Sequence, residues 1–149
     1  MLTVGLTPAQ TAGLESMALS CSSAPTIQGF PSCSANIANS GTAVSVSDGS
    51  NAVTYTGAAL FDSGTPDMIL APPNGVTLPM TPGTNIIVDN QQVLITLPNG
   101  YDFSYLTTPS GIDATVVNVT GTGRNIVGIG FFQNHDFYID FTASTEGWH

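Results

Sequence analysis

The stretch AALFDSGT, residues 58–65, decides how the fold is interpreted. Four consecutive apolar residues are typical of a buried strand, and the strand ends at Asp62. Ser63 and Thr65 bring hydroxyl donors next to that carboxylate, and Gly64 lets the backbone approach it closely. Burial tends to raise the pKa of such a carboxyl unless hydrogen bonds offset the effect. Two interpretations are open: a carboxylate for acid–base work on a bound water, or an aspartate that caps a turn at a strand end.

Alternating apolar and polar residues predict strands on both sides of this stretch. Two hairpins are expected at the turn signals DG and NG, formed by residues 43–47 with 52–56 and by residues 92–97 with 101–106. Further strands are expected over residues 2–6, 85–89, 114–119 and 137–141, with an apolar segment over 68–70 and a buried segment over 125–132. The fold class is therefore all-β with one or two short helices.

The N-terminal region holds the clearest helix signal. Thr7 is a capping residue, Pro8 suits the first helical position, and Gln10 completes a capping box. We expect a helix over residues 8–19, followed by a long loop over residues 20–41.

Cys21 and Cys33 are the two cysteines of the chain and fall in that expected loop. They form either a local disulfide in an exported protein or a pair of free thiols. We favour the disulfide, which would stabilise the fold by ~2–3 kcal/mol. We expect no metal here, because a zinc site needs about four ligands.

The length and charge of the chain limit its domain organisation and the classes of partner that it can bind. A chain of 149 residues is one domain, which we divide into an N-terminal region (1–41) and a core (42–141). One Lys or Arg against ten Asp and Glu gives a net charge of −9, which excludes nucleic acids and anionic membranes as partners. The start of the chain does not resemble a signal peptide, so we expect either that a signal was removed or that the chain is an excised domain. The polar, lysine-free composition favours a secreted, periplasmic or cell-surface location.

Together with the segment NIVG at residues 125–128, the AALFDSGT stretch resembles the aspartic proteases, both pepsin-like and retropepsin-like. In that family an Asp-Ser/Thr-Gly loop carries the catalytic aspartate, and a later apolar-apolar-Gly segment packs beneath it. The resemblance covers about residues 42–141 and is closest to the C-terminal lobe of a pepsin-type chain. It implies a closed or partly open β-barrel with a ψ-shaped loop.

The resemblance also implies roles for single residues. Asp62 would be the catalytic aspartate, and the Thr65 hydroxyl would bond to its outer oxygen. Ser63 would meet a partner lobe, beside Gly64 of the same loop, and Gly128 would be the glycine of the packing segment. Two further residues, Tyr101 and Tyr105, are candidates for a flap tyrosine in the second hairpin.

This chemistry requires two carboxylates about 3 Å apart that share one proton, and the chain has one Asp-Ser-Gly loop. The resemblance therefore implies an aspartic endopeptidase lobe that needs a homodimer or a missing second lobe, acts on a peptide or protein substrate, and uses no cofactor. Pro66 departs from the family pattern, and residues 1–41 have no counterpart in it. The alternative is a non-enzymatic exported β-domain, either a degenerate protease fold or an adhesion or binding module.

Overall fold

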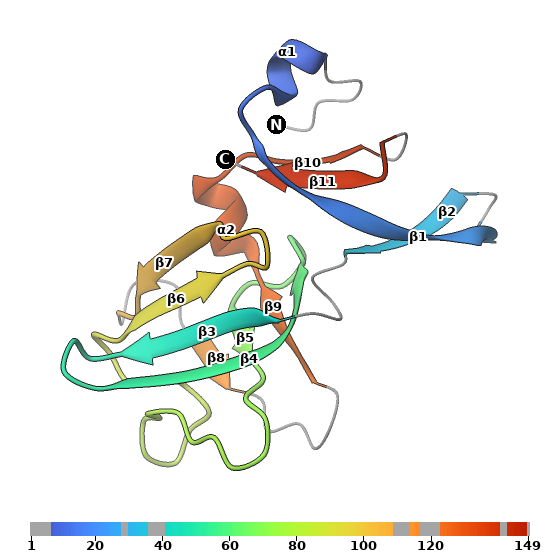
Figure 1. Cartoon of the computed structure of the whole chain (residues 1–149). Helices are drawn as coiled ribbons and strands as arrows, with labels where there is room; N and C mark the ends of the chain where they lie inside the picture. The colour runs from blue at the N-terminus through green and yellow to red at the C-terminus, as the bar shows by residue number, and fades with distance from the viewer. Residues whose placement is uncertain are drawn as a thin grey trace.

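The computed structural model describes residues 7–27, 30–35, 41–108, 114–116, 123–140 and 143–148. This part of the chain is mainly β, with two short helices (Figure 1). The strands are β1 (Glu15–Ile27), β2 (Phe30–Ala35), β3 (Thr42–Ser47), β4 (Ala52–Phe61), β5 (Met68–Leu70), β6 (Gln92–Thr96), β7 (Asp102–Leu106), β8 (Ala114–Val116), β9 (Arg124–Val127), β10 (Phe137–Asp140) and β11 (Thr145–Trp148), and the helices are α1 (Pro8–Thr11) and α2 (Ile129–Asn134). None of the described helices is long and apolar enough to cross a bilayer.

A curled seven-stranded sheet forms the larger part of the molecule, in the order β7-β6-β3-β4-β9-β5-β8. Both predicted hairpins are confirmed, as β3–β4 and β6–β7. The Asp48 carboxylate closes the first turn by accepting hydrogen bonds from the N–H groups of Ser50 and Asn51, at 2.8 and 2.7 Å. Gly100 has a φ of 89° in the second turn, a conformation that favours glycine.

Strand β9 lies between β4 and β5, although more than 50 residues separate it from both along the chain. It runs parallel to β4, with Val127 opposite Phe61, and antiparallel to β5, with Ile126 opposite Ile69. Gly128 ends β9, and a side chain at this position would collide with the carbonyl oxygens of Thr65 and Asp67. The turn between β4 and β5 is therefore held directly against the end of β9.

A buried amide fixes this arrangement. Asn125 is 1% exposed, and its Oδ1 accepts hydrogen bonds from the Tyr55 hydroxyl and from the Ala71 N–H, at 2.8 and 2.9 Å. Its Nδ2 donates to the Ala58 carbonyl oxygen at 2.9 Å. Burial raises the pKa of the Tyr55 hydroxyl, which therefore remains a donor. One side chain thus ties β9 to β4 and to the backbone that follows β5.

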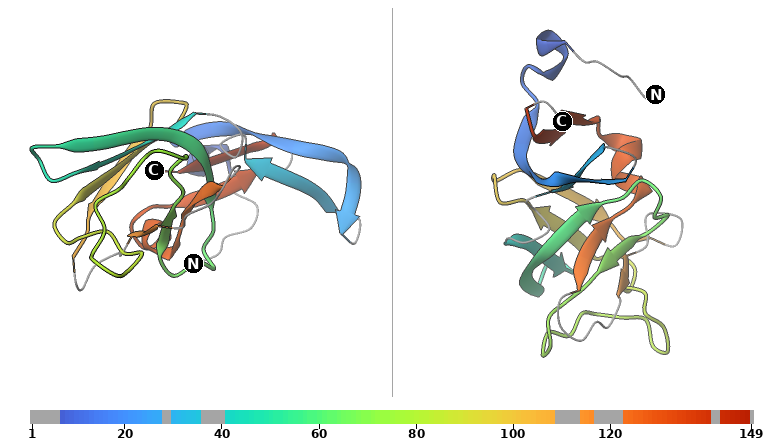
Figure 2. Two further views of the ribbon diagram at one scale, coloured as in Figure 1. Left: turned by 90° about the horizontal axis from the view of Figure 1, so that it is seen from below. Right: turned by 90° about the vertical axis from the view of Figure 1, so that its right-hand side faces the viewer.

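The N-terminal and C-terminal segments form a second sheet, in the order β10-β11-β1-β2, which we call the terminal sheet. It stands at one end of the seven-stranded sheet (Figures 1 and 2). Aromatic rings join the two sheets: the Phe61 ring centroid lies 4.8 Å from that of Phe131, 5.3 Å from that of Trp148 and 5.6 Å from that of Phe137. Leu19 and Trp148 of the terminal sheet belong to the same buried core as the inward side chains of β3 and β6.

The N-terminal region differs from the prediction. The helix begins at Pro8 as expected, where the Gln10 side-chain oxygen accepts a hydrogen bond from the Thr7 N–H at 2.9 Å. It ends at Thr11 rather than at residue 19, because Gly13 follows with a φ of 83°. The expected loop over residues 20–41 is also wrong, because most of it is strand in β1 and β2. These strands are specified by pairing with each other and with the distant β11, which local composition does not reveal.

The two cysteines oppose each other in this hairpin, with the Cα atoms of Cys21 and Cys33 as direct partners in the antiparallel register. Their side chains lie outside the described part of the structure. The predicted disulfide therefore remains a prediction that the backbone register favours.

Of the remaining predicted elements, one is wrong and others are confirmed in part. Residues 85–89 do not form a strand and contribute only an isolated bridge between Ile87 and Met80. The segment 125–132 divides at Gly128 into β9 and the unexpected helix α2, and β11 was not anticipated. The strand expected over 114–119 is described only as β8, and the one expected over 2–6 lies outside the described residues.

The Asn125 network generates a stability prediction. Replacing Asn125 with Ala leaves a hydroxyl, an N–H and a carbonyl group without partners, and each such buried group costs ~1–3 kcal/mol. We expect Asn125→Ala to lower the free energy of unfolding by about 3 kcal/mol or more, measured by urea denaturation. The exposed Asn85 is the matched control, and Asn85→Ala is expected to change it by less than about 0.5 kcal/mol. Equal effects of the two substitutions would contradict the structural role of the buried amide.

Candidate active site

The turn between β4 and β5 carries the aspartate singled out in the sequence, and both of its halves are tied to the end of β9. The Asp62 N–H donates to the Val127 carbonyl oxygen at 3.0 Å. On the far side of the turn, the Ile129 N–H donates to the Thr65 carbonyl oxygen at 2.8 Å. The position of the Asp62 carboxylate is therefore set by strand pairing rather than by the turn alone.

Each oxygen of the Asp62 carboxylate accepts one hydrogen bond from within the turn. The Gly64 N–H donates to Oδ1 at 2.9 Å, and the Thr65 hydroxyl donates to Oδ2 at 2.8 Å. The hydrogen bond from the Gly64 N–H has the largest effect on the pKa of Asp62 and lowers it. The hydrogen bond from the Thr65 hydroxyl lowers this pKa further, and partial desolvation opposes the shift with a smaller effect. The carboxylate of this half-buried side chain is thus held ionised without a cation.

Hydrogen bonds, rather than burial, set the direction in which the pKa of Asp62 is shifted. The sequence offered burial and compensating hydrogen bonds as opposing influences, and the hydrogen bonds prevail. An ionised carboxylate can accept a proton from water, but it cannot itself protonate or polarise a carbonyl group. Chemistry that needs both steps requires a second acidic group from outside this turn.

The other residues of the turn face outward. Ser63, Gly64 and Pro66 are exposed, while Thr65 is half-buried beneath the carboxylate. Gly128 is buried against the turn. The structure therefore brings Asp62, Gly64, Thr65 and Gly128 together, and it leaves Ser63 accessible from solvent.

The two tyrosines of the second hairpin are both engaged in packing. Tyr101 is half-buried, with its ring centroid 5.8 Å from that of Trp148 and 6.4 Å from that of His135. The Tyr105 hydroxyl donates to the Met68 sulfur at 2.6 Å, and burial raises the pKa of this hydroxyl. Neither side chain is free to close over the Asp62 turn in this conformation.

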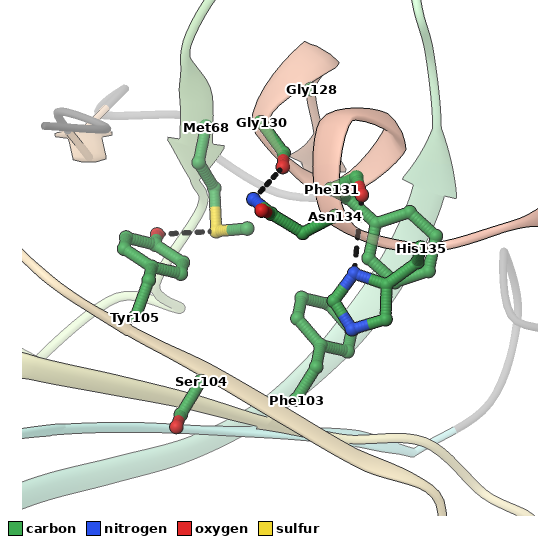
Figure 3. Close-up of a pocket in the computed structure, with 9 residues that line it drawn as sticks. All are labelled: Met68, Phe103, Ser104, Tyr105, Gly128, Gly130, Phe131, Asn134 and His135. Atoms are coloured by element: carbon green, nitrogen blue, oxygen red, sulfur yellow. Dashed lines mark hydrogen bonds between the residues drawn. The ribbon is translucent and has the colours of Figure 1, made fainter. Parts of the chain in front are cut away.

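A small pocket opens between β7 and α2 (Figure 3). Its cavity volume is about 110 Å³, and it is lined by Met68, Phe103, Ser104, Tyr105, Gly128, Gly130, Phe131, Asn134 and His135. Asp62 does not line it, so the pocket is separate from the carboxylate, although Gly128 both lines the pocket and lies against the Asp62 turn. Within the described ranges, no three His, Cys, Asp or Glu side chains are placed to share a metal ion.

His135 lies directly after α2 and packs back against this helix. The ring is half-buried and stacks on Phe131 with a centroid distance of 4.3 Å and an interplanar angle of 2°. Its Nδ1 lies 3.1 Å from the Phe131 carbonyl oxygen. The four-residue spacing of Phe131 and His135 is the signal for this contact, and it becomes informative only once a helix is assigned there.

No model of a known protein family matches the chain, and no curated protein or solved structure is significantly similar to it. What the Asp62 turn can do therefore follows from its own geometry and chemistry.

The two hydrogen bonds to the carboxylate give a direct test of the site. Thr65→Val removes the donor to Oδ2, so we expect the pKa of Asp62 to rise toward its ordinary value. The pH titration of the Asp62 carboxyl carbon, followed by NMR, measures this shift. Ser63→Ala, in the same turn, removes an exposed hydroxyl and is expected to leave the titration unchanged.

The same shift has a consequence for stability. Because the pKa of Asp62 is lowered in the folded chain, its ionisation stabilises the fold above the ordinary pKa, and this stabilisation is lost as the pH falls through the folded value. The Thr65→Val chain should therefore lose less stability than the wild type on acidification. Identical acid sensitivity of the two chains would contradict the assignment.

Proposed function

We propose that this chain is one lobe of an aspartic endopeptidase that hydrolyses peptide bonds with Asp62 as its catalytic carboxylate. The observation that carries the proposal is the pair of hydrogen bonds from Gly64 and Thr65 to the two oxygens of Asp62. The Thr65 hydroxyl is the donor that the resemblance to aspartic proteases leads one to expect. The position of β9 between β4 and β5, with Gly128 against the turn, supports the same family through its ψ-shaped arrangement.

Peptide hydrolysis by this route needs a second carboxyl group about 3 Å from Asp62, and the two share one proton. The ionised carboxylate accepts a proton from water as the water oxygen attacks the peptide carbonyl carbon. The protonated carboxyl group donates its proton to the carbonyl oxygen, which gives a tetrahedral diol. The diol collapses as its C–N bond breaks: the proton taken from water passes to the leaving nitrogen, and one hydroxyl group of the diol returns a proton to the second carboxylate. The products are an amine and a carboxylic acid, and the pair of carboxyl groups again shares one proton. The pKa of Asp62 is already lowered by its hydrogen bonds, so in an isolated lobe it is prepared for the role of the ionised partner.

The second carboxyl group must come from a partner lobe, either Asp62 of a second copy or an aspartate of a lobe joined to this one. Ser63 and Gly64 are exposed beside the carboxylate, so the turn can be approached by another lobe without rearrangement of the core. The substrate is a peptide or protein segment in an extended conformation, because a bound strand exposes its carbonyl groups to a pair of acids. We further propose an exported location, with the disulfide between Cys21 and Cys33.

One observation favours the alternative, a non-enzymatic β-domain that binds without cleaving. Tyr101 and Tyr105 pack against Trp148 and Met68, so the hairpin β6–β7 offers no free tyrosine to cover a substrate. A lobe of this kind would keep the same fold and lose the hydrolysis.

Mutation of the catalytic carboxylate distinguishes the two functions. We expect the wild-type chain, in its paired form, to cleave a denatured protein substrate between about pH 3 and 6, where a carboxyl pair shares a proton. Asp62→Asn should abolish cleavage, because an amide cannot accept the proton from water. Asp89→Asn, which changes an exposed aspartate outside the turn, should leave the rate unchanged. Product release is followed by mass spectrometry of the peptides.

The pairing of lobes is tested on the same samples by sedimentation. If two copies complete the site, activity per chain rises with concentration and parallels the dimer fraction. A chain that is fully dimeric at acid pH and cleaves nothing would rule out a site made by two copies. An Asp62→Asn chain as active as the wild type would rule out Asp62 as the catalytic carboxylate.

A further inference from the structure

A buried carboxyl group occupies the middle of the terminal sheet. Glu146 is 3% exposed and lies on β11, which runs between β1 and β10, with Met17 and Ile139 as its register partners. Its Oε1 has no hydrogen-bond partner among the described residues. Unlike Asp62, this carboxyl group has nothing in the described part of the chain that compensates an ionised state at that oxygen.

The charged groups around it do not supply a counter-charge. From β1 the nearest is Glu15, which lies opposite Trp148, and from β10 it is Asp140, opposite Thr145. On the core side of the terminal sheet, the titratable groups near Trp148 are Tyr101, and His135 next to it. Arg124, which is the single Lys or Arg of the chain, is exposed on β9 in the other sheet.

Burial alone raises the pKa of Glu146, to about 7 from an ordinary value of 4.5. Because the pKa is raised, the folded chain favours the protonated form of Glu146. The contribution of Glu146 to stability is therefore full below its ordinary pKa and declines as the pH rises from 4.5 through about 7.

Strand β11 also connects this carboxyl group to the aromatic cluster, which consists of Phe61, Phe131, Phe137 and Trp148. Trp148 is two residues from Glu146 and so projects from the same face of β11. It is fully buried, and its ring lies 5.3 Å from that of Phe61 at an interplanar angle of 28°. Phe61 directly precedes Asp62, so the terminal sheet and the candidate active site meet at this stack.

We propose that Glu146 is a proton-operated latch of the terminal sheet. The protonated form is neutral and compatible with the buried position, so β11 stays paired between β1 and β10, with Trp148 packed on Phe61. When the proton leaves to solvent, the uncompensated buried carboxylate draws β11 toward water, and Trp148 leaves the aromatic cluster. This inference is independent of peptide hydrolysis, and it holds whether or not Asp62 is catalytic.

Trp148 is the single tryptophan of the chain and reports on the latch directly. We expect the emission of the wild-type chain to shift to longer wavelength, and its quenching by acrylamide to increase, as the pH rises from about 4.5 to 8.5 across the range in which the group titrates. The midpoint should lie between 4.5 and about 7, because the opened form has the ordinary pKa and the closed form has the raised one. Glu146→Gln keeps the shape of the side chain without an ionisable group, so its emission should stay at short wavelength throughout.

The matched control is Glu15→Gln, which makes the same chemical change at an exposed residue opposite Trp148 on β1. It should show the wild-type transition. Imidazole groups titrate in the same pH range, but His135 is retained in all three chains. A transition that persists in Glu146→Gln, or a wild-type chain with no transition, would overturn the latch.

Hydrogen exchange of the wild-type chain decides the question even if Glu146→Gln does not fold. After correction for the intrinsic pH dependence, amide protection should be lost between about pH 5 and 8 in β10, β11 and the part of β1 that pairs with β11, while β3 and β6 keep theirs. Protection that is unchanged in β11, or that falls equally in both sheets, would overturn the proposal.

Discussion

The passage of β9 between β4 and β5 is the constraint on which the rest of the structure depends. It requires a strand from late in the chain to lie beside a strand of the first hairpin, and one buried amide stabilises this arrangement. Asn125 satisfies three groups on two other segments at once, β4 and the backbone that follows β5. Gly128 then leaves room for the carbonyl oxygens of the turn to lie against the strand end. The candidate active site is a consequence of this junction, because the turn that holds Asp62 is also the connection between β4 and β5.

A second long-range contact orients the same turn from the opposite side. The Phe61 ring, adjacent to Asp62 in sequence, is surrounded by aromatic rings from α2, β10 and β11. The terminal sheet is thus more than a closure of the two chain ends. It supplies Trp148 to the packing that holds the end of β4, so changes in β11 reach the residue next to the carboxylate through a single ring stack.

Local chemistry made the hairpins and the Asp62 turn predictable, because Asp48, Gly100 and the donors at Gly64 and Thr65 act within a few residues of one another. The elements that were missed depend on distant partners. The polar β1 and β2 become strands by pairing with each other and with β11, and α2 forms where a glycine ends β9. The burial of Glu146 in the short polar-looking sequence TEGW follows from the position of β11 in the sheet, which no local pattern reveals.

Asp62 and Glu146 have pKa values shifted in opposite directions, and neither shift comes from a cation, of which the chain has one. Asp62 remains ionised because an N–H and a hydroxyl are aimed at its oxygens, whereas Glu146 favours its proton because burial is the sole influence on it. Hydrogen-bond donors decide the charge of Asp62 and burial decides that of Glu146, and neither depends on an ion pair. Raising the pH leaves Asp62 as it was and charges Glu146, so the terminal sheet is the part of the fold that responds. Mildly acidic conditions are the range in which an ionised Asp62 and a protonated Glu146 exist together.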